Sequence, residues 1–313
     1  MIPPSPIAYH VERRARYVLS APAAGWSSRD ETASRRTANH VSPSIEPTPR
    51  VGGDRIRRVF VAAGAALIPL LADASAQEVD TPGPSSLVAV YPDFVERIDG
   101  NELVMRDGSR LIVDDGKPPK SFDERLRDPD LKDMFLTPYR SGRPLQSPKI
   151  DEDPGRARND AFFKKMYGDC AKNEVRPKLR RVTWMPLWGG GEVEATTVNG
   201  VADHLEAAAR ELQALPERFK RYLVPNEGAY YCRAIAGTTQ TSMHSYGVAI
   251  DINTRYSDYW RWPSPPPDPI AYRNQIPFEI VEIFERHGFI WGGKWYHFDT
   301  MHFEYRPELM GRN

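Results

Sequence analysis

Several features are scarce or missing in this chain of 313 residues. It has only two cysteines, no internal repeats, and no net charge, with 42 basic and 42 acidic side chains. The longest apolar run, Val59–Leu71, has 13 residues and falls short of the roughly 20 needed for a membrane-spanning helix. These absences argue against a repeat architecture, a stable membrane span, and a basic surface for nucleic acid.

The charge is unevenly distributed along the chain. Residues 1–76 hold ten Arg, no Lys and six acidic residues, so residues 77–313 hold 42 − 10 = 32 basic and 42 − 6 = 36 acidic residues. The later part is therefore slightly acidic, which again disfavours nucleic acid as a partner. Prolines number 29, which is typical of a loop-rich protein.

The N-terminal region indicates export. Residues 1–54 are rich in Ser, Pro, Ala and Arg without periodicity, and we interpret them as a disordered or non-native extension. Residues 55–76 combine arginines, the apolar run and the motif A-S-A, which is typical of a secretory signal peptide. Because such a signal belongs at the N-terminus, we expect translation to begin near Val51 and the exported chain to begin at Gln77.

The rest of the chain divides into an N-terminal elaboration and a main domain. Residues 77–155 predict a linker followed by a β-hairpin over residues 102–113, turning at Asp107 and Gly108. The Pro- and Asp-rich stretch 117–155 predicts loop. This elaboration either packs on the main domain or forms a separate cell-wall-binding module, and we favour the first.

Residues 156–313 alternate helical and extended patterns. Helical spacing predicts helices over 159–167, 198–215 and 277–287, and an apolar run predicts a strand over 181–185. The proline-dense stretch 260–269 predicts an irregular loop, either a wall of a cleft or a plain connection. We therefore expect an α+β domain with a small antiparallel sheet and flanking helices.

Two motifs concentrate residues that bind metals. In the first, S-x-H-x-x-G-x-A-x-D at 242–251, strand alternation places Asp251 on one face, and Gly247 permits the turn that returns His244 to that face. In the second, D-x-x-H-F-E at 299–304, His302 lies on one face of a strand. Two His and one Asp form a typical catalytic zinc set, with a fourth position left for water.

These two motifs together resemble the zinc D-alanyl-D-alanine carboxypeptidase family, which includes vancomycin-resistance D,D-peptidases and L-alanyl-D-glutamate endolysins of phages. The resemblance covers roughly residues 165–310. It implies Zn²⁺ on His244, Asp251 and His302, with Asp299 as the catalytic base where some members carry Glu. It also implies a hedgehog-like or D,D-peptidase-like fold around the metal.

Further side chains near the motifs are candidates for the same site. Arg233 either binds a substrate carboxylate or polarises the scissile carbonyl, as an upstream arginine does in the family, and a structural salt bridge is the alternative. Ser242 contacts substrate or caps the turn. His297 is a rival ligand or a donor to the tetrahedral intermediate, and Glu304 orients His302.

The two cysteines, Cys170 and Cys232, both follow the signal, and in an oxidising compartment two such cysteines commonly pair. We expect a disulfide, with neither cysteine a metal ligand or nucleophile.

The overall hypothesis is an exported, monomeric zinc peptidase of the periplasm or cell envelope that cleaves peptidoglycan peptides. D,D-carboxypeptidase activity leads, followed by L-alanyl-D-glutamate or D,D-endopeptidase activity. A non-catalytic zinc-containing binding domain is the alternative of another class. A carboxylate at position 299 favours the enzyme.

Overall fold

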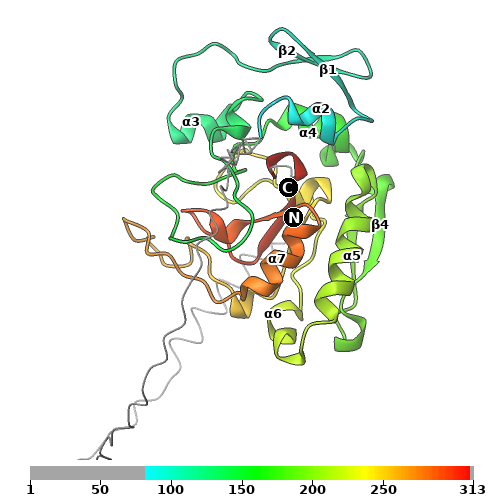
Figure 1. Ribbon diagram of the computed structural model, residues 1–313, viewed down its shortest axis with the longest axis vertical. Helices are drawn as coiled ribbons and strands as arrows, with labels where there is room; N and C mark the ends of the chain where they lie inside the picture. Colours follow the sequence, from blue (N-terminus) through cyan, green and yellow to red (C-terminus); the bar gives the residue numbers. More distant parts are fainter. Residues whose placement is uncertain (1–81, 311–313) are drawn as a thin grey trace, which may run out of the picture. The chain divides into compact units, whose positions relative to one another are not determined.

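The computed structural model describes residues 82–310, which form an α+β arrangement of short helices and small antiparallel sheets (Figure 1). The helices are α2 Ser86–Val90, α3 Phe122–Arg127, α4 Asp160–Tyr167, α5 Val201–Gln213, α6 Lys220–Leu223 and α7 Phe278–Arg286. The strands are β1 Val95–Asp99, β2 Glu102–Met105, β3 Arg110–Ile112, β4 Leu179–Thr183, β5 Glu192–Thr196, β6 Ala249–Asp251, β7 Phe289–Trp291 and β8 His302–Tyr305. The α+β class expected from the sequence is confirmed.

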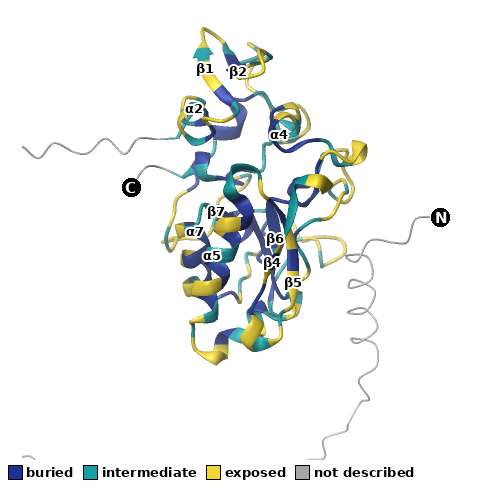
Figure 2. Ribbon diagram, turned by 90° about the vertical axis from the view of Figure 1, so that its right-hand side faces the viewer, coloured by how far each residue is buried: buried dark blue, intermediate teal, exposed yellow. Residues whose placement is uncertain are grey.

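The central sheet has the order β6-β8-β7, with both neighbours antiparallel to β8. Helix α7 packs against this sheet, and Phe284 of the helix stacks on Phe303 of β8 with ring centroids 3.9 Å apart. In Figure 2 these strands are buried, while α5 and α7 keep an exposed outer face. The sheet thus gives the two motif segments a rigid, water-free support.

The second layer combines the hairpin β4–β5 with α5, whose buried face has the helical spacing expected from the sequence. The strand predicted over 181–185 is β4, which lies two residues earlier, at Leu179–Thr183. Its ladder ends at Thr183 opposite Glu192, and Met185 then adopts a left-handed backbone (φ 45°) just before Pro186. A strand cannot continue through that geometry, so the apolar residues 184–185 belong to the turn.

The predicted helices form with small shifts at their ends. The helix expected at 159–167 begins at Asp160 because the Asn159 side chain caps it, accepting a hydrogen bond of 2.9 Å from the Phe162 amide. The one expected at 198–215 starts at Val201, since Asn199 is left-handed (φ 54°) and leaves a separate 3₁₀ turn before it. Helix α7 follows Pro277 and ends before Gly288, as predicted.

The N-terminal segment contains the predicted hairpin, formed by β2 and β3, and an additional strand β1 on the other side of β2. Its turn contains Gly108 at φ 83°, which suits glycine. The stretch 117–155 is mostly loop, as expected, apart from α3 and one 3₁₀ turn. This segment packs on the same hydrophobic core as the main domain, through Leu87, Tyr91 and Tyr139 among others.

Cys170 and Cys232 form a disulfide, the pairing expected from the sequence. It links the chain just after α4 to the segment that leads into the first motif. Residues 1–54 and the proposed signal at 55–76 lie outside the described residues. Among residues 82–310, no helix is both long and apolar enough to cross a membrane.

Candidate metal centre

Strand pairing brings Asp251 and His302 together. In the register of β6 and β8, Asp251 lies directly opposite His302, and directly opposed residues of an antiparallel pair project to the same face. The Asp251 Oδ1 atom is 3.0 Å from His302 Nδ1. Two sequence segments about 50 residues apart therefore contribute neighbouring side chains through one strand pair.

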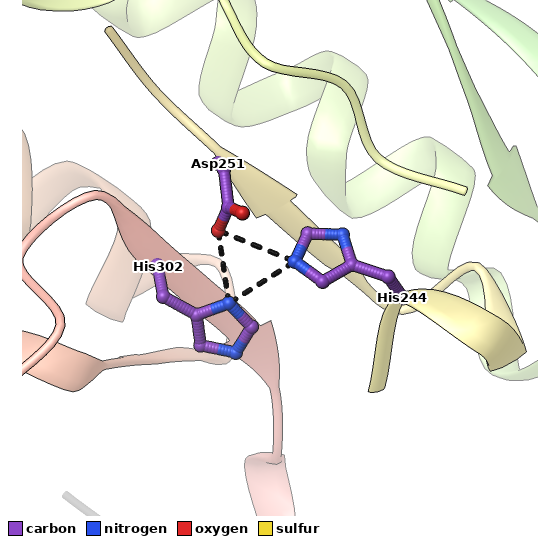
Figure 3. A group of neighbouring side chains, drawn as sticks. All are labelled: His244, Asp251 and His302. Atoms are coloured by element: carbon purple, nitrogen blue, oxygen red, sulfur yellow. Dashed lines mark hydrogen bonds and ion pairs between the residues drawn. The ribbon is translucent and has the colours of Figure 1, made fainter. Parts of the chain in front are cut away.

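His244 reaches the same point from the 3₁₀ turn Met243–Tyr246. Gly247 ends this turn at φ 70°, and a Cβ there would lie 2.8 Å from Leu179 Cδ2 and 3.1 Å from the Thr196 amide nitrogen. Only glycine fits both the conformation and the space. The His244 Nε2 atom is 3.2 Å from both Asp251 Oδ1 and His302 Nδ1, so the three side chains point toward one another (Figure 3).

Both histidines have an acceptor on the side away from the centre. His244 Nδ1 lies 2.6 Å from the Ala229 carbonyl oxygen, and His302 Nε2 lies 2.9 Å from Glu304 Oε2. With these outward nitrogens as donors, the other nitrogen of each ring would offer its lone pair to a cation at the centre. The arrangement is the one that metal-binding histidines use.

The electrostatics of the cluster favour a positive charge at its centre. Burial opposes a charged imidazole, but Asp251 and Glu304 outweigh it and raise the pKa of His302 to about 9. Burial alone would raise the pKa of Asp251, whereas His244 and His302 hold it well below its usual range. The site therefore attracts a proton when no other cation is bound.

The donor set fits zinc. Two imidazole nitrogens and one carboxylate oxygen are common ligands of catalytic zinc, and they lie 3.0–3.2 Å apart here. Tetrahedral bonds of about 2.0–2.1 Å would place neighbouring ligand atoms about 3.3 Å apart. The three residues could hold the ion with small adjustments.

A second group of three carboxylates, Asp114, Asp115 and Asp130, lies in the N-terminal segment. Lysines already occupy it: Lys120 Nζ is 2.9 Å from Asp115 and Lys132 Nζ is 2.6 Å from Asp114. The ammonium groups supply the positive charge, so this group is an ion-pair network.

Glu304 is locked in place on the far side of His302. Arg158 donates to it from Nε at 3.3 Å and Nη2 at 2.5 Å, and Arg306 Nη1 donates at 3.1 Å. Burial would raise the pKa of Glu304, but Arg158, His302 and Arg306 hold it well below its usual range. A permanently ionised, fully engaged carboxylate suits orientation of His302 and not proton transfer.

Asp299 is held by its backbone, and one oxygen of its carboxylate is buried without a hydrogen-bond partner among residues 82–310. Its amide donates to the Gly292 carbonyl at 3.0 Å, and its own carbonyl accepts from the His302 amide at 3.2 Å. Within residues 82–310, the buried Oδ1 atom has no hydrogen-bond partner. Burial first and Asp251 second raise the pKa of Asp299 to about 7, against the opposing influence of His302, Arg156 and Arg233.

The other predicted residues surround this centre in different ways. The backbone of Arg233 is fixed by Ser245, whose hydroxyl contacts the Arg233 amide at 2.9 Å and its carbonyl at 2.8 Å. The positive charge of Arg233 acts on Asp299. Ser242 is buried, and its amide donates a hydrogen bond of 3.1 Å to the Arg233 carbonyl.

His297 is not part of the three-residue cluster. Its Nδ1 is 2.7 Å from Asp153 Oδ2, and its ring stacks on Phe122 and meets Trp260 edge-on at 4.7 Å between centroids. The structure thus brings His302, and not the rival His297, to Asp251 and His244.

Sequence reasoning did not identify three contributors: Ala229, Arg156 and Arg158. The carbonyl of Ala229 carries no side-chain signal, and the arginines contact residues about 140 positions away. Trp260 lies in the proline-dense loop, which the sequence assigned to a wall of a cleft or a plain connection. Its buried Nε1 has no hydrogen-bond partner among residues 82–310.

Comparison with known families gives one match. The sequence model of the family described as D-alanyl-D-alanine carboxypeptidase matches residues 236–305, which include His244, Asp251, Asp299 and His302. No curated protein and no solved structure matches the chain. The resemblance noted from the two motifs is confirmed over these residues, and it supports a peptidase. Arg158 and Arg233 lie outside the matched range.

Proposed function

We propose that this chain is an exported zinc peptidase that hydrolyses peptidoglycan stem peptides, with D-alanyl-D-alanine carboxypeptidase as its leading activity. One observation carries the proposal: among residues 82–310 the buried Asp299 Oδ1 atom has no hydrogen-bond partner, and its carboxyl interacts electrostatically with Asp251 and His302 of the convergent set His244, Asp251 and His302. All four residues lie in the range that matches the peptidase family.

In this proposal, His244 Nε2, Asp251 Oδ1 and His302 Nδ1 hold the metal. Ala229 and Glu304 keep the two imidazoles in the required tautomers and orientations. When bound, Zn²⁺ would polarise the scissile carbonyl and lower the pKa of a bound water to about 7.

Asp299 is the proposed general base. Its Oδ1 is free to accept a proton from the attacking water and then to deliver it to the leaving amine. The fixed backbone keeps this oxygen in place without occupying it, through Gly292 on one side and His302 on the other. Arg156 and Arg233 favour the ionised form that accepts the proton.

Arg233 is proposed to bind the substrate carboxylate or to polarise the scissile carbonyl, with its backbone fixed by Ser245. Ser242 is proposed to contact the substrate beside it. His297, oriented by Asp153, is a candidate donor to the tetrahedral intermediate.

Export is supported by the disulfide and by the signal-like residues 55–76. We propose a periplasmic or cell-envelope location, and we predict that the exported chain begins at Gln77. Sequencing the N-terminus of the secreted protein checks this prediction, and a mature chain that retains residues 1–54 would refute it.

Two alternative functions would use the same site. L-alanyl-D-glutamate or D,D-endopeptidase activity would use the same residues on a different bond, because the surrounding loops select the bond. A non-catalytic zinc-containing binding domain would have no use for a free carboxylate at position 299, so Asp299 favours an enzyme.

Digestion of purified peptidoglycan with the zinc-loaded protein, followed by mass analysis of the released fragments, tests the proposal. Loss of a single terminal D-alanine indicates the carboxypeptidase, whereas release of larger peptides indicates an endopeptidase. The Asp299→Asn variant at equal zinc content is the matched control. Binding to peptidoglycan with no release of any fragment would instead indicate the binding domain.

A further inference from the structure

A cavity of about 280 Å³ lies where three distant segments of the chain meet. Its walls come from residues 126–129 at the end of α3, residues 156–163 before and in the first turn of α4, and residues 239–246, which lead into and include the start of the first motif. The volume approaches the lower end of the range of about 300–1,000 Å³ that is typical of small-ligand pockets. One wall therefore belongs to the N-terminal segment, outside the range that matches the family.

The walls are tied to one another. The Asn159 side-chain amide donates to the Pro129 carbonyl at 2.9 Å, and the Tyr246 hydroxyl donates to Asp160. The middle segment is thus hydrogen-bonded to each of the other two, which helps to form the cavity before any ligand enters and reduces the entropy lost on binding.

More arginines than carboxylates line the cavity. The arginines are Arg127, Arg156 and Arg158, and the carboxylates are Asp128 and Asp160. Both carboxylates are already engaged by lysines outside the lining, each at 2.9 Å: Asp128 by Lys117 and Asp160 by Lys164. The two acidic groups therefore pair with lysines and not with the arginines of the lining.

The three arginines differ in how far they are engaged. Arg158 is buried and committed to Glu304. Arg156 donates to the His297 carbonyl at 3.0 Å and lies 3.6 Å from Asp153. The Asp153 carboxylate also contacts the His297 ring. Across residues 82–310, no carboxylate lies within ion-pair distance of Arg127, so its guanidinium has donors available for a ligand.

The cavity adjoins the proposed active site. Arg158 contacts Glu304, which contacts the proposed ligand His302. Tyr246 of the cavity wall is the last residue of the turn that carries His244, and Arg156 acts electrostatically on Asp299. Arg158 thus links the cavity to the support of His302, and Arg156 links it electrostatically to the proposed base.

We propose that this cavity is a subsite for a free carboxylate of the substrate, bound by Arg127 and Arg156. The inference rests on the proposed function and deepens it: the substrate is an acidic peptide, and the D-glutamate of a stem peptide has the required chemistry. Guanidinium groups suit this role because their paired donors match the two oxygens of a carboxylate.

The test uses two stem peptides that differ only in the glutamate α-carboxylate, free in one and amidated in the other. The wild-type enzyme should prefer the free acid in kcat/KM by about 10-fold, the size expected for hydrogen bonds to a charged group. Arg127→Gln should reduce this preference to less than about threefold, mainly through KM, and Arg127→Lys should restore part of it.

Arg181→Gln is the matched control, because Arg181 is an exposed arginine of β4 with only a 3.4 Å contact to Glu192. It should keep the full preference. The subsite would be overturned if the wild-type enzyme had the same kcat/KM for both peptides. It would also be overturned if Arg127→Gln and Arg181→Gln lost the preference for the free acid to the same extent.

A binding measurement separates this subsite from the proposed catalysis. Zinc-loaded Asp299→Asn, titrated with each peptide by calorimetry, should bind the free acid about 10-fold more tightly. If neither peptide is hydrolysed by the wild type but this difference persists, the proposed function is wrong and the subsite stands. If the wild type cleaves both peptides and the variant binds them equally, only the subsite is wrong. If neither peptide is cleaved or bound, both are wrong.

Discussion

Replacing Asp299 with Asn separates the role of base from the role of ligand or support. The substitution keeps the size of the side chain and removes the proton acceptor. Because Oδ1 has no hydrogen-bond partner among residues 82–310, the change breaks no contact of that atom. The backbone bonds to Gly292 and His302 do not depend on the side chain. We therefore expect the variant to fold and to keep its zinc.

The magnitude follows from the general-base role. Such catalysis contributes about 10²- to 10⁴-fold, so kcat should fall by at least about 10²-fold. Substrate binding should change much less, because the lost interaction belongs mainly to the transition state. The assay pairs zinc content with turnover of a stem-peptide mimic ending in D-Ala-D-Ala, or of whole peptidoglycan. Asp299→Glu should keep partial activity if the longer acid can replace it.

Stability provides a second, independent readout of the same variant. In the metal-free protein the pKa of Asp299 rises from an ordinary value of 3.8 to about 7, through burial and the charge of Asp251. A carboxyl whose pKa is raised on folding destabilises the folded state once ionised, so stability is lost as the pH rises from 3.8 through 7. Asp299→Asn should remove this loss: the metal-free variant should match the wild type near pH 4 and exceed it at pH 8, by at most about 4 kcal/mol.

Three results would refute this reasoning about Asp299. Unchanged turnover would place the base elsewhere. Loss of zinc would make Asp299 a ligand or its support. A metal-free variant less stable than the wild type at pH 8, measured by chemical denaturation, would show that the carboxylate has stabilising contacts after all.

Three further predictions concern the metal, the scaffold and the disulfide. His302→Ala should lose most of the zinc, since two protein ligands rarely hold it, and full occupancy by elemental analysis would point to another ligand. Gly292→Ala would place a Cβ 2.6 Å from the Asp299 carbonyl oxygen, so kcat should fall while zinc is kept; an unchanged kcat would show that the segment adjusts freely. Cys170 and Cys232 are 62 residues apart, so replacing both with Ser should lower the free energy of unfolding by about 4 kcal/mol in the chain-entropy model, and a loss below about 1 kcal/mol would contradict it.

The part of the site that could be predicted from sequence is the part built from short-range patterns. Alternation along residues 248–252 and 300–305 places Asp251 and His302 on defined strand faces, and Gly247 marks the turn at His244. The strand register then pairs the two faces directly. Local periodicity was sufficient here because each motif contains a short strand that carries one proposed ligand, Asp251 in β6 and His302 in β8.

The remainder depends on contacts that no local pattern records. Arg158 and Glu304 are 146 residues apart, and Asp153 and His297 are 144 residues apart. An arginine in a loop has no periodicity that indicates its partner. Arginines are also usually expected to be exposed to solvent, whereas Arg158 is buried. The extra strand β1 was missed for a related reason: its exposed face carries charged residues, so its apolar alternation is weak.

The N-terminal segment also supports His302, a proposed zinc ligand, from a distance. His302 contacts Glu304, Glu304 contacts Arg306, Arg306 contacts Glu308, and Glu308 accepts a 2.5 Å hydrogen bond from the Tyr91 hydroxyl. These charges are fully buried and stabilise one another only while the set is complete, because an unpaired buried charge is strongly unfavourable. A separate cell-wall-binding module would have its own core, and its residues would not need to complete this network of buried ion pairs. The shared core and the shared ion network therefore favour the packed elaboration, in which residues before 156 help to orient a ligand of the proposed zinc.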